Sequence, residues 1–200
     1  MESIIYERAG MGDATHDGKE IVSSKRLAFT LYIALTIMLF AGLFGGWWVL
    51  KGNNEIWPPT GTPELSLMNM LPENLTMIAS VILLVAAMSY LKKADFQKFG
   101  MYVLISAAMC ILFVFALGME YWRLIAGGVT MSTVFGGMYF IIMTAFLAHF
   151  IGGIIALFRF TQKAKLFPAQ IGIKIGFANT LNWHYLMLLL WVCIVALVYG

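Results

Sequence analysis

Residues 133–158 read TVFGGMYFIIMTAFLAHFIGGIIALF, and this stretch decides the fold class because it contains no Asp, Glu, Lys or Arg. A helix needs about 20 apolar residues to cross the hydrocarbon core of a bilayer. Four further apolar stretches lie at 27–50, 75–91, 100–118 and 183–199. We therefore predict an all-α, polytopic membrane protein, a bundle of five transmembrane helices.

The composition excludes a soluble domain. The 200 residues are 61% hydrophobic and only 12% charged, whereas about 25% charged residues is usual in soluble proteins. At this length we expect one domain over 27–200, preceded by a flexible polar arm at 1–26 that remains cytoplasmic. Nothing in the composition suggests a nucleic-acid partner.

The distribution of positive charge predicts the orientation, because cytoplasmic loops of membrane proteins are enriched in Lys and Arg. Only Lys51 and Arg123 of the 13 basic residues fall on one side of the predicted membrane. The other side carries Arg8, Lys19, Lys25, Arg26, Lys92, Lys93, Lys98, Arg159, Lys163, Lys165 and Lys174. We expect a cytoplasmic N-terminus and a C-terminus outside.

The segment between the first two predicted helices contains Pro58, Pro59 and Pro63. Proline removes a backbone donor and fixes φ, so we expect an ordered, extended turn here. Asn74 is interpreted as the N-cap of the second helix.

The acidic residues are predicted to avoid the membrane interior. Glu73 is assigned to the first outer loop and Glu120 to the outer end of the third helix. Ion pumps and proton-coupled transporters usually carry ionisable groups inside the membrane, so a self-contained pump is disfavoured. Glu120 and Arg123 have the spacing of a helical ion pair. Such a pair contributes little when solvated, but when shielded it could fix the helix end or hold a phospholipid.

Two histidines, His149 and His184, fall inside or near the bilayer. We predict that they differ in depth by several ångströms, which disfavours a bis-histidine haem, and a metal site lacks further ligands. Each imidazole is expected to bond to a neighbouring helix or a lipid headgroup. The chain is therefore predicted to hold no metal or cofactor.

Small residues are placed for close helix packing. Gly42 and Gly46 form a GxxxG pair in the first helix, and Gly152 and Gly153 lie together in the fourth. This spacing indicates helix association without identifying a partner.

Several ordered motifs resemble subunit III of the haem–copper terminal oxidases, in the short, five-helix form of bacterial oxidases. These motifs are MLFAGLFG at 38–45, Trp57-Pro58-Pro59, Gly118-Met119-Glu120-Tyr121, His149-Phe150-Ile151-Gly152-Gly153 and Trp183-His184-Tyr185. Three polar positions of the family are replaced, by Thr36, Phe146 and Met187. The replacements put in doubt any proton relay through these positions.

The resemblance implies an accessory, non-redox subunit with no active site of its own, in a proton-pumping cytochrome c oxidase of aerobic respiration. It would pack on subunit I, whose complex holds the haem and copper, bind phospholipid and support sustained turnover and proton uptake. Subunit II, a small subunit IV and a respiratory supercomplex are further expected partners, in the bacterial inner membrane. The residues expected in polar, lipid or interface contacts are Glu120, Arg123, His149, Trp183 and His184.

Alternative functions remain open at this stage. The same scaffold occurs in quinol oxidases and as an accessory subunit of nitric oxide reductase, although the proline-rich turn favours the cytochrome c branch. A stand-alone transporter or lipid-binding membrane protein is an alternative of another class. A haem-b membrane anchor is a third.

Overall fold

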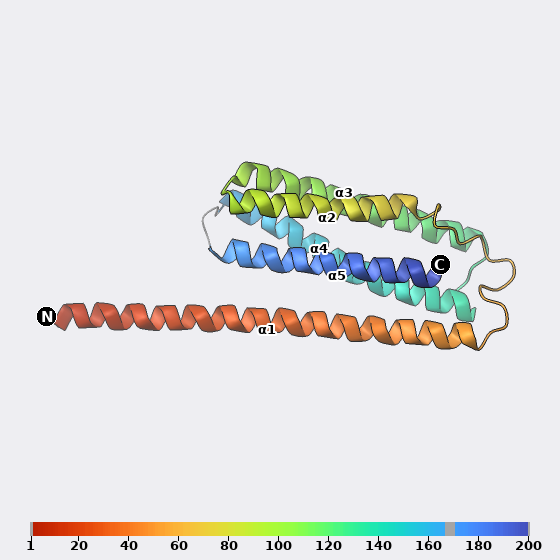
Figure 1. Ribbon diagram of the computed structural model, residues 1–200, viewed down its shortest axis with the longest axis horizontal. Helices are drawn as coiled ribbons and strands as arrows, with labels where there is room; N and C mark the ends of the chain where they lie inside the picture. The colour runs from red at the N-terminus through yellow and green to blue at the C-terminus, as the bar shows by residue number, and fades with distance from the viewer. Residues whose placement is uncertain (1, 167–170, 200) are drawn as a thin grey trace. The chain divides into compact units, whose positions relative to one another are not determined.

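The computed structural model describes residues 2–166 and 171–199, and all regular structure in this part of the chain is α-helical. Figure 1 shows the elements, which are α1 (Glu2–Gly52), α2 (Leu71–Lys92), α3 (Phe96–Ala126), α4 (Val134–Leu166) and α5 (Ile171–Val198). Each contains a segment long and apolar enough to cross a membrane: Leu27–Gly52, Leu71–Lys92, Phe96–Ala126, Val134–Phe160 and Lys174–Val198. The prediction of an all-α protein with five membrane-spanning helices is confirmed.

Helices α2 and α3 extend beyond the apolar segments that predicted them. Helix α2 begins at Leu71, with Pro72 in its first turn, where the missing N–H of proline has no helical partner to lose. Asn74 therefore lies inside the helix, and its interpretation as the N-cap is wrong, because Met70 occupies that position. Helix α3 continues to Ala126.

Helix α1 crosses the boundary between two units of the chain, Met1–Gly42 and Leu43–Gly200. In the first unit, the helix includes residues 2–26 and continues into the apolar segment without a break. The flexibility of this part stays a prediction. Near the position of the family's carboxylate, Thr36 Oγ1 donates to the Tyr32 carbonyl at 2.9 Å, which satisfies the hydroxyl within its own helix.

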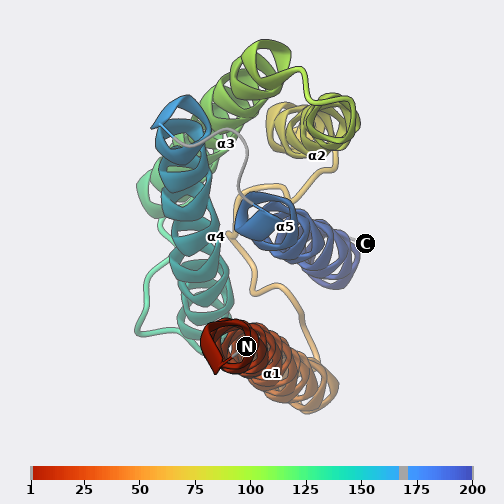
Figure 2. The same ribbon diagram turned by 90° about the vertical axis from the view of Figure 1, so that its left-hand side faces the viewer.

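In the second unit, helices α2 to α5 contact one another in a closed cycle. Helix α2 packs against α3 and α5, and α4 packs against the same two helices. Figure 2 views these helices from near their ends. The centre of the cycle is aromatic: the buried rings of Phe150 and Trp191 lie 4.8 and 4.9 Å from that of Phe113. Such offset and edge-to-face contacts add to the stabilisation from apolar burial.

The connection between α1 and α2 is ordered, and residues 54–66 contain no helix, as its prolines predict. The ring of Trp57 lies 5.1 Å from that of Trp47 and 5.3 Å from that of Phe135. Pro63 lies so close to Gly127 that a Cβ at that glycine would overlap it. These contacts fix the connection against the end of the bundle where α2 and α4 begin and α3 and α5 end, which we call the loop end.

Candidate ligand site at the loop end

An ion pair within α3 lies at the centre of the loop end. The guanidinium of Arg123 donates from Nε to Oε2 and from Nη2 to Oε1 of Glu120, each at 2.7 Å. This two-point geometry is the strongest arrangement for such a pair. The Glu120 side chain is 2% exposed and that of Arg123 is 35% exposed. The sequence left open whether this ion pair is solvated or shielded. In the structure its carboxylate is shielded from solvent.

Two tyrosines extend this pair to other helices. Tyr199, directly after α5, donates a 3.1 Å hydrogen bond to Glu120 Oε1, and its hydroxyl lies 2.9 Å from that of Tyr139 on α4. Since Tyr199 donates to the carboxylate, Tyr139 is the donor to Tyr199. Burial raises the pKa of the Tyr199 phenol, so it stays protonated and remains a donor. Sequence reasoning missed this role of both tyrosines, because a tyrosine at a helix end is typical of the membrane interface.

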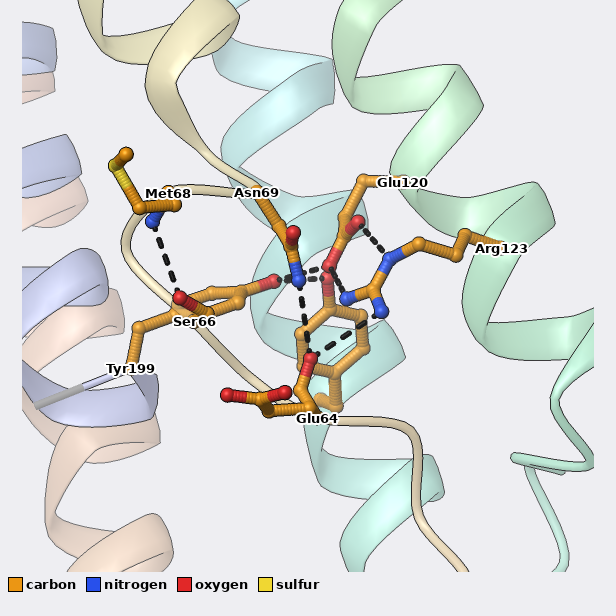
Figure 3. A network of polar contacts seen from close by, with 8 residues as sticks. Glu64, Ser66, Met68, Asn69, Glu120, Arg123 and Tyr199 are labelled. Atoms are coloured by element: carbon orange, nitrogen blue, oxygen red, sulfur yellow. Dashed lines mark hydrogen bonds and ion pairs between the residues drawn. The ribbon is translucent and has the colours of Figure 1, made fainter.

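The connection between α1 and α2 joins the same network (Figure 3). The Glu64 carbonyl accepts from Arg123 Nη1 and from Asn69 Nδ2, both at 3.2 Å. Arg123 therefore links α3 to the loop as well as to its own helix, because its planar group presents donors in several directions.

Glu73 is a second buried acid at this end. It lies in the first turn of α2 and is 2% exposed, so its assignment to an outer loop is wrong. Glu120, near the end of α3, is buried as well, at 4% exposed. Both acids lie near helix ends, and their absence from the membrane interior stays a prediction. The Oε2 atom of Glu73 is buried and has no hydrogen-bond partner among the described residues. An unpaired buried carboxyl oxygen is costly, and such a group often marks a ligand site.

A cavity of about 570 Å³ adjoins both acids. Asn69, Pro72 and Glu73 form the side contributed by the loop and α2. The side contributed by α3 consists of Phe115, Ala116, Met119, Glu120, Trp122 and Arg123. Since an apolar lining with a few convergent polar groups is typical of small-molecule sites, this cavity is the candidate ligand site.

The three other predicted contact residues, His149, Trp183 and His184, lie away from this cavity, at the α4–α5 interface. The ring centroids of His149 and Trp183 are 6.2 Å apart, as are those of Phe150 and His184. These neighbouring contacts place the two histidines in one layer of the interface, so the predicted difference in depth is wrong.

Each histidine bonds to its own helix. Nδ1 lies 2.8 Å from the Ala145 carbonyl in His149 and 2.8 Å from the Thr180 carbonyl in His184. His184 is fully buried, and its Nε2 has no partner among the described residues. Its predicted bond to another helix or a lipid headgroup is therefore wrong. That the chain holds no haem stays a prediction.

The four glycines differ in their surroundings. A Cβ at Gly153 would lie 3.0 Å from the Trp183 ring and 3.2 Å from His184 Cε1, and one at Gly46 would lie 3.0 Å from Met138 Cε. A Cβ at Gly152 or at Gly42 would meet no atom within 4 Å. Gly153 and Gly46 thus allow close contact with other side chains, whereas the other two do not require a small residue.

Comparison with known proteins identifies the family. A scan against protein-family models finds no match. The chain is 30% identical over 174 residues to the probable cytochrome c oxidase subunit 3 of Nocardia farcinica, covering 84% of each chain. It is 28% identical to the probable subunit 3 of Mycobacterium leprae, with the same coverage. Identity to the cytochrome c oxidase subunit 3 of Thermostichus vulcanus is 25% over 197 residues, 96% of this chain and 95% of that one. The resemblance seen in the sequence motifs is confirmed, and the chain belongs to the cytochrome c oxidase subunit 3 family.

Proposed function

We propose that this multi-pass membrane protein is an accessory, non-redox subunit III that packs on the catalytic subunit I of a haem–copper oxidase. Its relatives, which are named as oxidase subunits over most of the chain, support its place in such a complex. In this proposal, subunits I and II carry the haem and copper, and a small subunit IV and a supercomplex are further partners. The membrane is the bacterial inner membrane, with the loop end facing outside.

Phospholipid binding is the second part of the proposal. The observation that carries it is the cavity at the loop end, where Arg123 and two buried acids adjoin the apolar side chains of Phe115, Met119 and Trp122. These three side chains are 57–70% exposed in this chain. A site with a charged end and an apolar side suits an amphiphile, because its charged groups pair with the headgroup and its apolar side chains contact the acyl chain.

The third part of the proposal is support of sustained turnover and proton uptake. A bundle whose loop end is fixed by the Glu120–Arg123–Tyr199 network offers subunit I a rigid neighbour and a defined lipid. In this proposal, the partner subunits reduce oxygen, and this chain prolongs the time for which the complex stays active during turnover.

Purification of the complex through a tag on this chain tests the first part. We expect a reduced-minus-oxidised spectrum with haem bands and co-purification of a large polytopic subunit. Cytochrome c and a quinol, supplied separately as electron donors, show which oxidase branch it serves. A haem band in the isolated chain would contradict the non-redox role.

Oxygen consumption over time tests the third part. A complex depleted of this chain should keep its haem spectrum and its initial rate but lose activity faster during turnover. Depletion that abolishes the initial rate, or that leaves the time course unchanged, would contradict the proposal.

A further inference from the structure

The outward face of α5 carries polar side chains inside the membrane-spanning segment of this helix. Asn182 and Tyr185 are exposed, and Asn179 is half-buried. The segment begins at Lys174, so a rise of 1.5 Å per residue places Asn182 about 12 Å and Tyr185 about 16 Å from that end. Because the hydrocarbon core of a bilayer is about 30 Å thick, both positions lie within it.

The amides on this face have no hydrogen-bond partner in the described part of the chain. Thr180 and His184, on the inward side of the same turns, bond to backbone carbonyls of α5, but the side chains of Asn179 and Asn182 bond to no described residue. A carboxamide has two N–H donors and one acceptor oxygen, and acyl chains satisfy neither. The face therefore requires a partner that offers donors and acceptors within the membrane.

The exposed residues of α5 have the spacing of a contact between two helices. Intervals of three, four, three and four residues separate Asn182, Tyr185, Leu189, Val192 and Ala196, and all five are exposed. We call these five residues the α5 seam. Their average period of 3.5 residues is that of left-handed helix pairs, in which the contact stays on one side of both helices. The seam therefore suits one further transmembrane helix that crosses α5 at a shallow angle.

Two features indicate that this helix is α5 of a second copy of the chain. No Asp, Glu, Lys or Arg follows Lys174 in the sequence, so two seams meet without repulsion between like charges. An amide is self-complementary, because it both donates and accepts hydrogen bonds. Copies inserted in the same orientation place Asn182 at the same depth, and a two-fold axis normal to the membrane brings the two amides together.

We propose that two copies of this chain associate through the α5 seam, with the Asn182 amides hydrogen-bonded to each other across the two-fold axis. A single asparagine in such a seam fixes the register between identical helices. The small side chain of Ala196 allows close approach near the other end of the helix. The inference goes beyond the accessory role proposed above and does not depend on it. Together, the two proposals join two oxidase complexes in one membrane.

Disulfide cross-linking in native membranes tests this contact in the assembled protein. Leu189→Cys places a thiol in the seam, and the control Ile141→Cys places one on α4 at a position of similar exposure, 55% against 60% for Leu189. Both changes are made together with Cys193→Ser, because Cys193 is exposed beside the seam. We expect oxidation to join two copies at least fivefold more often in the Leu189→Cys chain. Equal cross-linking of the two variants would overturn the proposal.

Replacement of Asn182 separates a specific contact from chance collision. Asn182→Leu, added to the Leu189→Cys chain, should lower the cross-linked fraction about fivefold, which is the effect of roughly one hydrogen bond between membrane helices. Asn182→Gln keeps a self-complementary amide and should retain most of the cross-linking. A cross-linked fraction that Asn182→Leu leaves unchanged would contradict the role of the amide pair.

Photo-cross-linking of the unmodified chain identifies what faces the seam. Cys193 is exposed beside it and Cys110 is buried, so a benzophenone maleimide attaches at one position. After irradiation of the complex in its membrane, we expect a product of two joined copies, linked through a peptide of α5. A product with a different polypeptide, with another helix of the same chain or with lipid alone would overturn the second copy as the occupant. Those outcomes would leave the proposed oxidase role standing.

Discussion

The indole Nε1 of Trp191 on α5 donates a 2.8 Å hydrogen bond to Oδ1 of Asn74 on α2. The bond connects helices that are separated in sequence by α3 and α4, and it lies in the contact that closes the cycle of α2 to α5. Since the donor and acceptor belong to different helices, the bond fixes their register.

Replacement of Trp191 by Phe should destabilise the bundle by about 1 kcal/mol, because it keeps most of the aromatic packing but leaves Asn74 Oδ1 without its donor. The thermal unfolding of the purified complex in detergent measures this loss. Trp48→Phe is the control, since Trp48 is 62% exposed. Equal shifts in Tm for the two variants would contradict the role of the bond.

Arg123→Ala should destabilise the chain by about 2 kcal/mol. The loss stays below the roughly 3–5 kcal/mol of fully buried pairs, because Arg123 is partly exposed. The variant leaves Glu120 buried with only Tyr199 as donor. Tm is compared with that of Lys98→Ala, which breaks the 3.4 Å pair with Asp95 at the same i, i+3 spacing.

The acid of the control pair is far less buried, since the Asp95 side chain is 34% exposed and that of Glu120 is 2% exposed, so removal of Lys98 should cost less than about 1 kcal/mol. If Arg123→Ala costs no more than Lys98→Ala, the burial of Glu120 is not important for stability. A double variant, Glu120→Gln with Arg123→Gln, should recover part of the loss, because it removes the unpaired charge.

Two adjacent glycines provide a matched pair of substitutions in α4. Gly153→Leu should destabilise the α4–α5 interface by about 1–3 kcal/mol, because its side chain overlaps the ring of Trp183. Gly152→Leu should be tolerated, because that position is exposed and open. Retention of the folded chain on size-exclusion chromatography after heating compares the two. Similar losses would contradict the packing role of Gly153.

The orientation of the chain is tested by cysteine labelling. Glu55→Cys at the loop end should react with a membrane-impermeant maleimide on intact cells, and Lys93→Cys between α2 and α3 should react only after lysis, because Lys-rich loops remain cytoplasmic. The background is Cys193→Ser, since Cys193 is exposed and Cys110 is buried. Labelling of Lys93→Cys on intact cells would reverse the topology.

The five helices were predictable from the sequence because each contains an apolar run that no charge interrupts. Their ends were not, because charged residues end an apolar run. Glu73 was therefore assigned to a loop although it lies in the first turn of α2, and α3 continues past Glu120 to Ala126. Burial of a carboxylate costs much less free energy when an ion-pair or hydrogen-bond partner is buried with it. The sequence does not show that the hydroxyl of Tyr199 donates to Glu120.

The candidate site was predictable only in part. The spacing of Glu120 and Arg123 indicated their ion pair, which is local to one helix. The contribution of Glu73 depends on where the first turn of α2 lies beside α3, and the bond between Asn74 and Trp191 spans 117 residues. Such relationships follow from the packing of the whole bundle, which a single sequence does not specify.

The closing contact between α2 and α5 has a consequence for biosynthesis. Chains enter the membrane from the N-terminus onward, so Asn74 and Glu120 are in place before Trp191 and Tyr199 have been synthesised. During that interval, the amide oxygen of Asn74 lacks the Trp191 donor and the carboxylate of Glu120 lacks the Tyr199 donor. The hydrocarbon core of the membrane supplies no other donor. A chain whose synthesis stops before α5 therefore exposes polar groups that are hydrogen-bonded in the complete chain. Quality-control proteases would be able to distinguish the two chains by this difference.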